Sequence, residues 1–198
     1  MATKGEVTRG KIIDDATRIF HRKGFLTTTI SDLLAATGTT KGNLYFHFAG
    51  KEAVGLAVLA NARAAFRDFL EASLQGASPG AQLDNFFSRA LERNRCNQSV
   101  GGCLFGNTAL EACDNAAPFA EIVSEVFSEW SARLEEIIAA AQAAGQVRRD
   151  LAAAQLAELV VATIEGAIMQ TRLKKNAEPL ARALDALRVL LELKCSPL

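Results

Sequence analysis

The sequence has few of the residues from which metal, redox and catalytic sites are usually built. Its 198 residues include only two histidines, His21 and His47, and its four cysteines form no Cys-x-x-Cys pair. Structural zinc sites are typically assembled from closely spaced cysteines and histidines. The sequence also lacks a nucleophile elbow, a paired-histidine metal motif and a glycine-rich cofactor turn. We therefore expect no metal, no cofactor and no enzymatic activity.

Proline and long apolar runs are also scarce. Only four prolines are present and alanine is abundant, which favours helix over sheet. The N-terminal residues carry charges throughout, unlike a signal peptide. The longest charge-free apolar stretches, such as 137–147, are far shorter than the roughly 20 residues that span a bilayer. The sequence predicts a soluble, cytoplasmic, all-α protein with no membrane partner.

A net charge of either sign is missing, but the charges are unevenly distributed. Residues 1–51 carry eight basic and four acidic side chains, a net charge of +4, so the rest of the chain carries −4. A basic segment attached to an acidic one suits phosphate binding at one end of the protein. A division of this size also arises by chance, so it supports nucleic-acid binding only together with other features.

A first helix is predicted over residues 8–23, because apolar residues recur there at intervals of three and four. Thr8 is its expected N-cap, and Gly24 is expected to end it. The residues of the expected buried face are Ile12, Ile13, Ala16, Ile19 and Phe20.

Two shorter helices are predicted next. Thr28 or Thr29 is expected to cap the second helix, which ends at Gly38, and Thr39 or Thr40 is expected to cap the third. Two short helices joined by a turn that contains glycine form the helix-turn-helix layout, whose second helix enters the DNA major groove. The aromatic and aliphatic residues expected in the core around these helices are Phe20, Leu44, Phe46 and Phe48.

The run from Gly38 to Ala53, Gly-Thr-Thr-Lys-Gly-Asn-Leu-Tyr-Phe-His-Phe-Ala-Gly-Lys-Glu-Ala, closely resembles the recognition-helix signature of the TetR family. The order of the elements and the Thr27–Ile30 run resemble the family as well, over about residues 8–60. The resemblance implies a homodimeric, ligand-responsive repressor that binds a pseudo-palindromic operator in double-stranded DNA. It also implies a three-helix DNA-binding head over 1–50 and an α-helical body over 51–198 that binds an unknown small-molecule effector and dimerises.

The resemblance allows DNA-binding roles to be assigned. The side chains expected at base edges are Thr39, Thr40, Lys41 and Asn43. Those expected at phosphates are Thr29, Tyr45, His47 and Lys51. Lysine favours guanine acceptors, and threonine bonds to a base or packs on a thymine methyl group. Gly42 would let the backbone approach the DNA, and phosphate contacts would supply affinity and register.

The rest of the chain is predicted to be helical, for about nine helices in all. The glycine-rich segment 99–111 lacks the trailing lysine of a phosphate-binding loop, and it resembles the segment around helix six of TetR proteins. The other helices are expected over 51–74, 81–97, 116–143, 151–173 and 178–193.

A ligand pocket is expected in the body, lined mainly by apolar side chains. Trp130, the only tryptophan, is interpreted either as part of this wall or as ordinary core. The candidate lining residues are Phe87, Leu91, Cys103, Leu104, Phe105, Thr108, Phe127, Trp130 and Met169.

The last two helices are expected to form the dimer interface. Their apolar stripes are broad, and such stripes are commonly buried on more than one side. A monomeric core would give the same pattern. The expected interface residues are Leu156, Val160, Ile164, Ile168, Leu180, Leu184, Leu187 and Leu191.

An alternative function is a thiol sensor, in which Cys96 and Cys103 detect oxidants or electrophiles. Arg93 and Arg95 flank Cys96 closely enough to favour its thiolate. The competing interpretation is inert packing, because cysteine is among the most commonly buried residue types.

Overall fold

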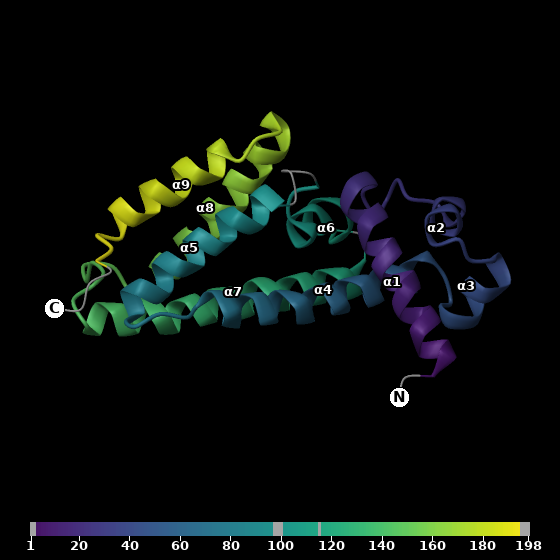
Figure 1. Ribbon diagram of the computed structural model, residues 1–198, viewed down its shortest axis with the longest axis horizontal. Helices are drawn as coiled ribbons and strands as arrows, with labels where there is room; N and C mark the ends of the chain where they lie inside the picture. The colour runs from purple at the N-terminus through teal and green to yellow at the C-terminus, as the bar shows by residue number, and fades with distance from the viewer. Residues whose placement is uncertain (1–2, 97–100, 115, 195–198) are drawn as a thin grey trace. The chain divides into compact units, whose positions relative to one another are not determined.

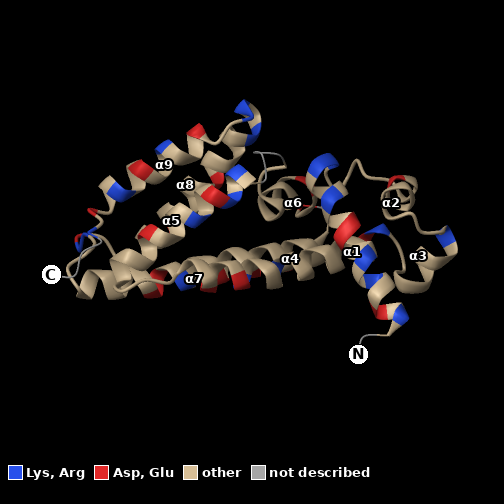
Figure 2. Ribbon diagram, in the orientation of Figure 1, with Lys and Arg blue, Asp and Glu red and all other residues tan. Residues whose placement is uncertain are grey.

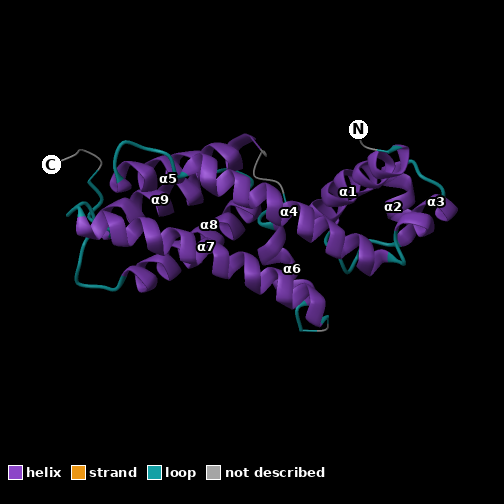
Figure 3. Ribbon diagram, turned by 90° about the horizontal axis from the view of Figure 1, so that it is seen from below, coloured by secondary structure: helices purple, strands orange, loops and turns teal. Residues whose placement is uncertain are grey.

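The computed structural model describes residues 3–96, 101–114 and 116–194. Within these ranges the regular structure consists of nine α-helices, with no strand (Figures 1 and 3). The predicted all-α fold is therefore confirmed. The helices are α1 (Lys4–Lys23), α2 (Ile30–Thr37), α3 (Lys41–His47), α4 (Lys51–Ser73), α5 (Pro79–Cys96), α6 (Leu104–Ala112), α7 (Ala117–Ala143), α8 (Ala153–Lys174) and α9 (Glu178–Leu190).

The chain packs into two compact units. The head unit contains residues 1–65 and 103–124, and the body unit contains residues 66–102 and 125–198. The long helices α4 and α7 contribute residues to both units. The head unit also contains residues beyond the predicted range of 1–50, because α6 packs against α1 and the first turns of α7 belong to the same compact unit.

The first helix of the head unit, α1, begins about one turn earlier than predicted. Thr3, not Thr8, is the N-cap of α1, and it forms a capping box with Glu6. The Thr8 hydroxyl donates to the Lys4 carbonyl at 2.9 Å inside the helix, so Thr8 is not available as a cap. Gly24 ends α1 with a positive φ of 88°, as predicted.

The core of the head unit lies between α1, the helix-turn-helix and the first turns of α4. Its side chains come from positions spaced three and four apart on α1 and α4 and from single anchors on α2 and α3. The fully buried members are Ile12, Ile13, Ala16, Phe20, Leu33, Leu44, Phe48, Val54 and Val58.

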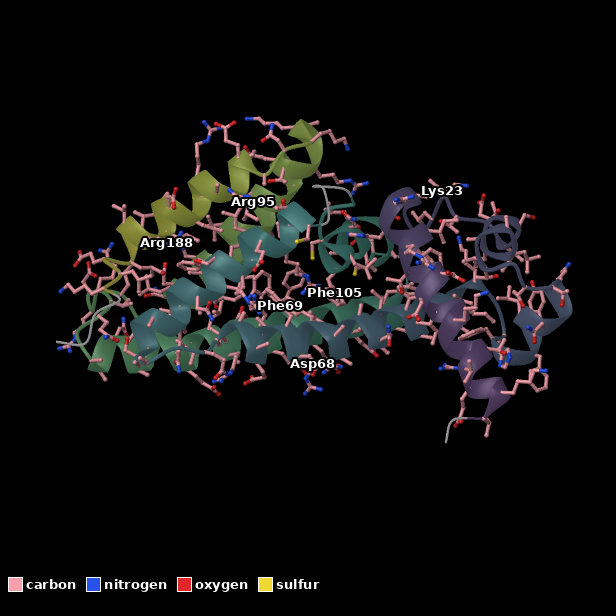
Figure 4. The ribbon with its side chains drawn as sticks, viewed as in Figure 1. Lys23, Asp68, Phe69, Arg95, Phe105 and Arg188 are labelled. Atoms are coloured by element: carbon pink, nitrogen blue, oxygen red, sulfur yellow. The ribbon has the colours of Figure 1, made fainter. Side chains whose placement is uncertain are left out.

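In the body unit, α8 and α9 pack side by side, and α9 also contacts α5 (Figures 1 and 3). Arg188 on α9 reaches α5, where its Nε lies 2.6 Å from Asp84 Oδ1 (Figure 4). An aromatic and aliphatic core fills the space between these helices and α7, with Phe86, Phe87 and Leu134 fully buried.

The residues predicted to form the dimer interface belong to this core. Seven of them are at most 2% exposed within the single chain, and Ile168 is half-buried against the same cluster. Side chains already buried by their own chain have no surface left for a second copy, so the prediction was wrong about this face. The seven residues are Leu156, Val160, Ile164, Leu180, Leu184, Leu187 and Leu191.

Candidate DNA-binding surface

The helix-turn-helix is set by three backbone signals. Thr29 caps α2, and its hydroxyl accepts from the Asp32 backbone N–H at 3.1 Å. Gly38 ends α2 in the left-handed conformation, at a φ of 63°. Thr40 then caps α3 by accepting from the Asn43 backbone N–H at 3.2 Å. The turn between the two helices is therefore specified by a glycine and a threonine cap, within the predicted alternatives.

An ionic contact fixes the start of α2 to the end of α1. Lys23 Nζ lies 2.6 Å from Asp32 Oδ2 (Lys23 is labelled in Figure 4). The same carboxylate accepts from the Thr29 backbone N–H at 2.8 Å and from its hydroxyl at 2.7 Å. Lys23 first, and then Thr29, hold the pKa of Asp32 well below its usual range.

The two faces of α3 have opposite characters. Leu44 is 1% exposed and Phe48, which follows the helix, is 5% exposed. Phe46, in contrast, is 81% exposed, so its predicted place in the core is wrong. Two residues along a helix is a rotation of about 200°, which turns position 46 away from the side that Leu44 buries. Gly42 lies on the same outward side, two residues before Leu44.

Two of the residues predicted at base edges are connected to each other. Asn43 Nδ2 donates to Thr39 Oγ1 at 2.7 Å, so the polar groups before and within α3 are held together. Lys41 is exposed at the first position of α3 and has no ion pair among the residues that the structure describes. Basic residues also line α1 (Figure 2). Lys41 is thus available to a ligand outside the chain, whereas Thr40 already serves as a cap.

The residues predicted at phosphates lie in different surroundings. Tyr45 is 45% exposed, and His47 is half-buried with its ring edge-on to Phe46, at 5.0 Å between centroids. The Lys51 amine donates to the carbonyl oxygens of Phe25 at 3.0 Å and Leu26 at 3.2 Å. Lys51 therefore holds the turn between α1 and α2, which sequence reasoning did not anticipate.

The same turn is bonded to α6. The Leu26 backbone N–H donates to Glu111 Oε2 on α6 at 3.2 Å. The Phe25 ring packs on Phe119 of α7, at 4.6 Å between ring centroids. The positive φ of Gly24 requires glycine, and a β-carbon there would also lie 2.6 Å from Glu111 Oε1, so any other residue would displace this carboxylate. Glu111 was not predicted as a site residue. Its only signal was the acidic end of the segment that resembles helix six of TetR proteins.

The head unit contains a small hollow with about 10 Å³ of internal space, roughly enough for one water molecule. Two residues predicted for the ligand pocket, Leu104 and Thr108, lie in its wall. Phe105 is 6% exposed on α6, and Cys103 is the N-cap of that helix. The other lining residues are Phe20, Phe25, Gly55, Val58, Leu59, Asn107, Glu111 and Phe119.

The remaining predicted pocket residues lie in the body unit. Phe87 is fully buried, and Leu91 and Phe127 are partly buried against the body core. Met169 is 62% exposed, so it faces outward on α8 and is not a wall residue. The prediction placed it inward because the apolar stripe of α8 has two sides, and the sequence does not show which one is internal.

Trp130 is buried without a hydrogen bond. The side chain is 4% exposed, and its Nε1–H has no hydrogen-bond partner among the residues that the structure describes. Its ring is edge-on to Phe66 at 5.3 Å between centroids and stacked on Phe127 at 6.2 Å. A buried N–H without an acceptor costs about 1–3 kcal/mol. Trp130 therefore differs from an ordinary core residue by one unsatisfied donor.

The described cysteines do not favour the thiol-sensor hypothesis. Cys103 Sγ accepts from the Gly106 backbone N–H at 3.4 Å as the cap of α6, which is a structural role. Burial first, and then the nearby Asp114 carboxylate, raise the pKa of the Cys113 thiol and reduce its thiolate fraction. Cys96 is exposed at the end of α5, and Cys195 lies outside the described residues.

Among the described residues, no three histidine, cysteine or acidic side chains are grouped closely enough to hold a metal ion. In the same part of the chain, no helix is both long and apolar enough to cross a membrane.

Comparison with known proteins decides the family. Residues 12–58 match the model for bacterial regulatory proteins of the tetR family, and residues 79–187 match the tetracycline repressor-like C-terminal domain. The HTH-type transcriptional repressor DhaR of Mycobacterium sp. (strain GP1) is 30% identical over 178 residues, which cover 87% of this chain and 86% of DhaR. The chain belongs to the TetR family.

Solved structures agree with this assignment. A TetR regulator from Chloroflexus aurantiacus is 32% identical, covers 96% of each chain and has a TM-score of 0.85. A regulatory TetR protein from Rhodobacter sphaeroides is 25% identical, covers 93% of this chain and 98% of its own, and has a TM-score of 0.87. The present chain is therefore a DNA-binding transcriptional repressor with a helix-turn-helix head. It belongs to a class of regulators that are not enzymes.

Proposed function

We propose that this repressor acts as a homodimer on a pseudo-palindromic operator and leaves it when a small molecule binds the body unit. A single observation carries the dimer proposal. The helix α8 keeps an apolar face exposed after its other face is buried in the core, and two apolar side chains near the end of α9 are exposed as well. A repressor with one reading helix per chain needs two copies to read a palindrome, with half-sites one helical turn, about 34–36 Å, apart.

The exposed face of α8 follows helical spacing. Leu159, Met169 and Leu173 are 42%, 62% and 79% exposed, and Ala162 and Gly166 lie between them at intervals of three and four. This is the side opposite to the stripe first predicted as the interface. An uncovered apolar stripe of this kind is typical of a surface that a second subunit covers.

On α9, exposed apolar side chains lie near the end of the helix, whereas Glu178, Arg182 and Asp185 are exposed before them. Val189 and Leu190 are 76% and 51% exposed near the end of α9. Because α8 and α9 pack side by side, their outward faces are available to one partner. A two-fold axis between two such pairs would produce an isologous four-helix interface.

The dimer proposal is tested by replacing one exposed leucine. Leu173→Glu should convert the protein from dimer to monomer in size-exclusion chromatography with light scattering, because it adds a charge to an apolar interface. The matched control is Leu110→Glu on α6, where the leucine is 83% exposed on a different helix. If both variants remain dimeric at micromolar concentration, the interface lies elsewhere.

The ligand proposal depends on Trp130. Its N–H is unpaired among the described residues. The Trp130 ring packs against the rings of Phe66, Phe86 and Phe127, at distances of 5.3 to 6.4 Å between ring centroids. An apolar ligand that carries one hydrogen-bond acceptor fits this chemistry, because it would satisfy the donor and keep the rings dry. The ligand shifts the repressor off DNA only by as much as it prefers the released state.

The route from ligand to DNA would pass through the turn between α1 and α2. Lys51 at the start of α4 and Glu111 on α6 both hold the backbone of this turn. A displacement of either helix would therefore move the turn or break its hydrogen bonds. The start of α2 would follow the turn, because Lys23 and Asp32 join it to α1.

The ligand proposal is tested with a panel of apolar ketones, aldehydes and esters. Each compound is titrated into the repressor bound to a fluorescein-labelled duplex that the protein has selected from a random library. Compounds that release DNA should change the emission of Trp130, and Trp130→Phe should weaken their effect about 2- to 12-fold through the lost hydrogen bond. The ligand would bind elsewhere if a compound released DNA without changing the Trp130 emission of the wild type and released Trp130→Phe with equal potency.

A further inference from the structure

Phe46 is the apolar side chain of the reading helix that the fold does not use. It is 81% exposed, and the ring contact recorded for it is the edge-on one with its neighbour His47. The core side of α3 is already occupied by Leu44, which is 1% exposed. Phe46 therefore makes no contribution to the core that would explain a phenylalanine at this position.

The position of Phe46 on α3 places its side chain on the outward side of the helix, which would contact DNA. Leu44 defines the buried side, and a step of two residues turns the helix by about 200°, so Gly42 and Phe46 both lie opposite Leu44. A β-carbon built on Gly42 meets nothing within 4 Å. The ring thus lies on the outward face near the C-terminal end of α3, one turn after a position with no side chain.

The chemistry of a phenyl ring restricts what it recognises in DNA. The ring has no donor for a phosphate oxygen and no donor or acceptor for the polar edge of a base. The apolar group that the major groove presents is the 5-methyl group of thymine, and phenylalanine is among the side chains that pack on it. The polar side chains of the same helix, Lys41 and Asn43, would read hydrogen-bonding edges instead.

We propose that Phe46 is a specificity-determining residue that packs on a thymine methyl group in each half-site of the operator. This inference depends on the proposed dimeric binding to a palindrome. It adds an apolar contact to the polar residues predicted at base edges, and it assigns a role to the exposed aromatic ring of the reading helix.

The test removes the methyl group from the DNA and the ring from the protein. A duplex is first selected by the wild-type repressor from a random library, and each thymine is then replaced in turn by deoxyuridine, which pairs identically but lacks the methyl group. Burial of one methyl group corresponds to about a fourfold change in Kd. We expect about a fourfold loss at one thymine of each half-site, and about 15-fold when both are replaced.

The protein arm of the test shows whether Phe46 is responsible. Phe46→Ala should bind the thymine duplex more weakly and no longer distinguish it from the deoxyuridine duplex at that position. Lys41→Ala should also bind more weakly but should keep the thymine preference. Circular dichroism melting of each variant verifies folding. Because Phe46 is exposed, its replacement should leave the fold intact.

The outcomes separate this inference from the proposal on which it depends. A selection that gives a palindrome, followed by full thymine preference in Phe46→Ala or by no sensitive thymine at all, overturns the role of Phe46 and leaves the operator intact. A selection that gives no preferred sequence overturns both. Loss of affinity in Phe46→Ala with an unchanged thymine preference indicates a sugar contact and also overturns the inference.

Discussion

Substitution of Gly42 by alanine should separate the stability of the repressor from its affinity for DNA. Gly42 is the second residue of α3, is exposed and lies on the outward side of the helix. An added β-carbon would meet nothing within 4 Å in the free protein, and no positive φ is recorded at this position. The fold therefore gives no reason for a glycine here, whereas close approach of the backbone to DNA does.

The magnitudes follow from these two environments. Alanine is favoured over glycine in a helix by up to about 0.5–1 kcal/mol, so the free repressor should be unchanged or slightly more stable. For a chain of this size such a gain raises Tm by about 1–4 °C. In the complex the methyl group would overpack the interface at a cost of about 1–3 kcal/mol, which is about 5- to 150-fold in Kd.

The assay combines thermal unfolding with fluorescence anisotropy on the selected duplex at a fixed salt concentration. Gly10→Ala is the matched control, because Gly10 also lies in a helix, has nothing within 4 Å of an added β-carbon and is not among the predicted DNA contacts. Gly10→Ala should stabilise the protein and leave Kd unchanged. Wild-type affinity in Gly42→Ala would refute the close approach of this part of α3 to DNA.

Substitutions at three further positions test the head unit. Gly55→Ala places a β-carbon 2.7 Å from Phe25 Cε2 and 2.9 Å from Phe119 Cζ. It should destabilise the protein by about 1–2 kcal/mol in urea unfolding, because the overpacking outweighs the gain in helix propensity. An unchanged urea midpoint would mean that the two rings move freely. Glu111→Ala removes the acceptor of the Leu26 N–H and should cost about 0.5–1.5 kcal/mol, while Glu111→Gln keeps an acceptor and should cost less; equal losses would contradict the role of the hydrogen bond. Asp32 has a lowered pKa, so its contribution to stability is present above the unfolded pKa, about 3.9, and is lost as pH falls through the folded value. Asp32→Asn should therefore be less stable than wild type at pH 7, with a difference that shrinks below about pH 4; a difference that is constant with pH would exclude the charged contact.

The helix-turn-helix was largely predictable because its signals are local. A threonine cap, a left-handed glycine and an inward leucine each act over three or four residues, and Thr29, Gly38 and Leu44 have the predicted positions. Thr8 was misassigned because both Thr3 and Thr8 precede a run compatible with helix, and only Thr3 has a glutamate three residues later. Phe46 was misassigned because hydrophobicity was given more weight than its angular position.

Contacts between distant segments were not predictable from one sequence. The hydrogen bond from Leu26 to Glu111 joins residues 85 positions apart, and nothing in the local pattern of either segment identifies the other. Lys51 illustrates the same difficulty, since a basic residue at a helix start near the DNA-binding head suggests phosphate. In the structure its amine donates to the carbonyl oxygens of Phe25 and Leu26, so a phosphate contact by Lys51 would compete with, or share, these hydrogen bonds.

The α8 helix shows why periodicity identified the helix but not which of its two apolar stripes is internal. Leu156 and Leu159 are three residues apart and both apolar, yet one is 1% exposed and the other 42%. Two apolar stripes on one helix give a broad hydrophobic pattern that does not rank the stripes, since the internal one is chosen by packing against α9 and the other helices of the body. A single exposed leucine would carry no argument, but Leu159, Met169 and Leu173 form an exposed apolar stripe, which is typical of a surface that a partner covers. The burial of the first stripe therefore strengthens the argument for a second copy, although it moves the proposed interface to the opposite side of the helix.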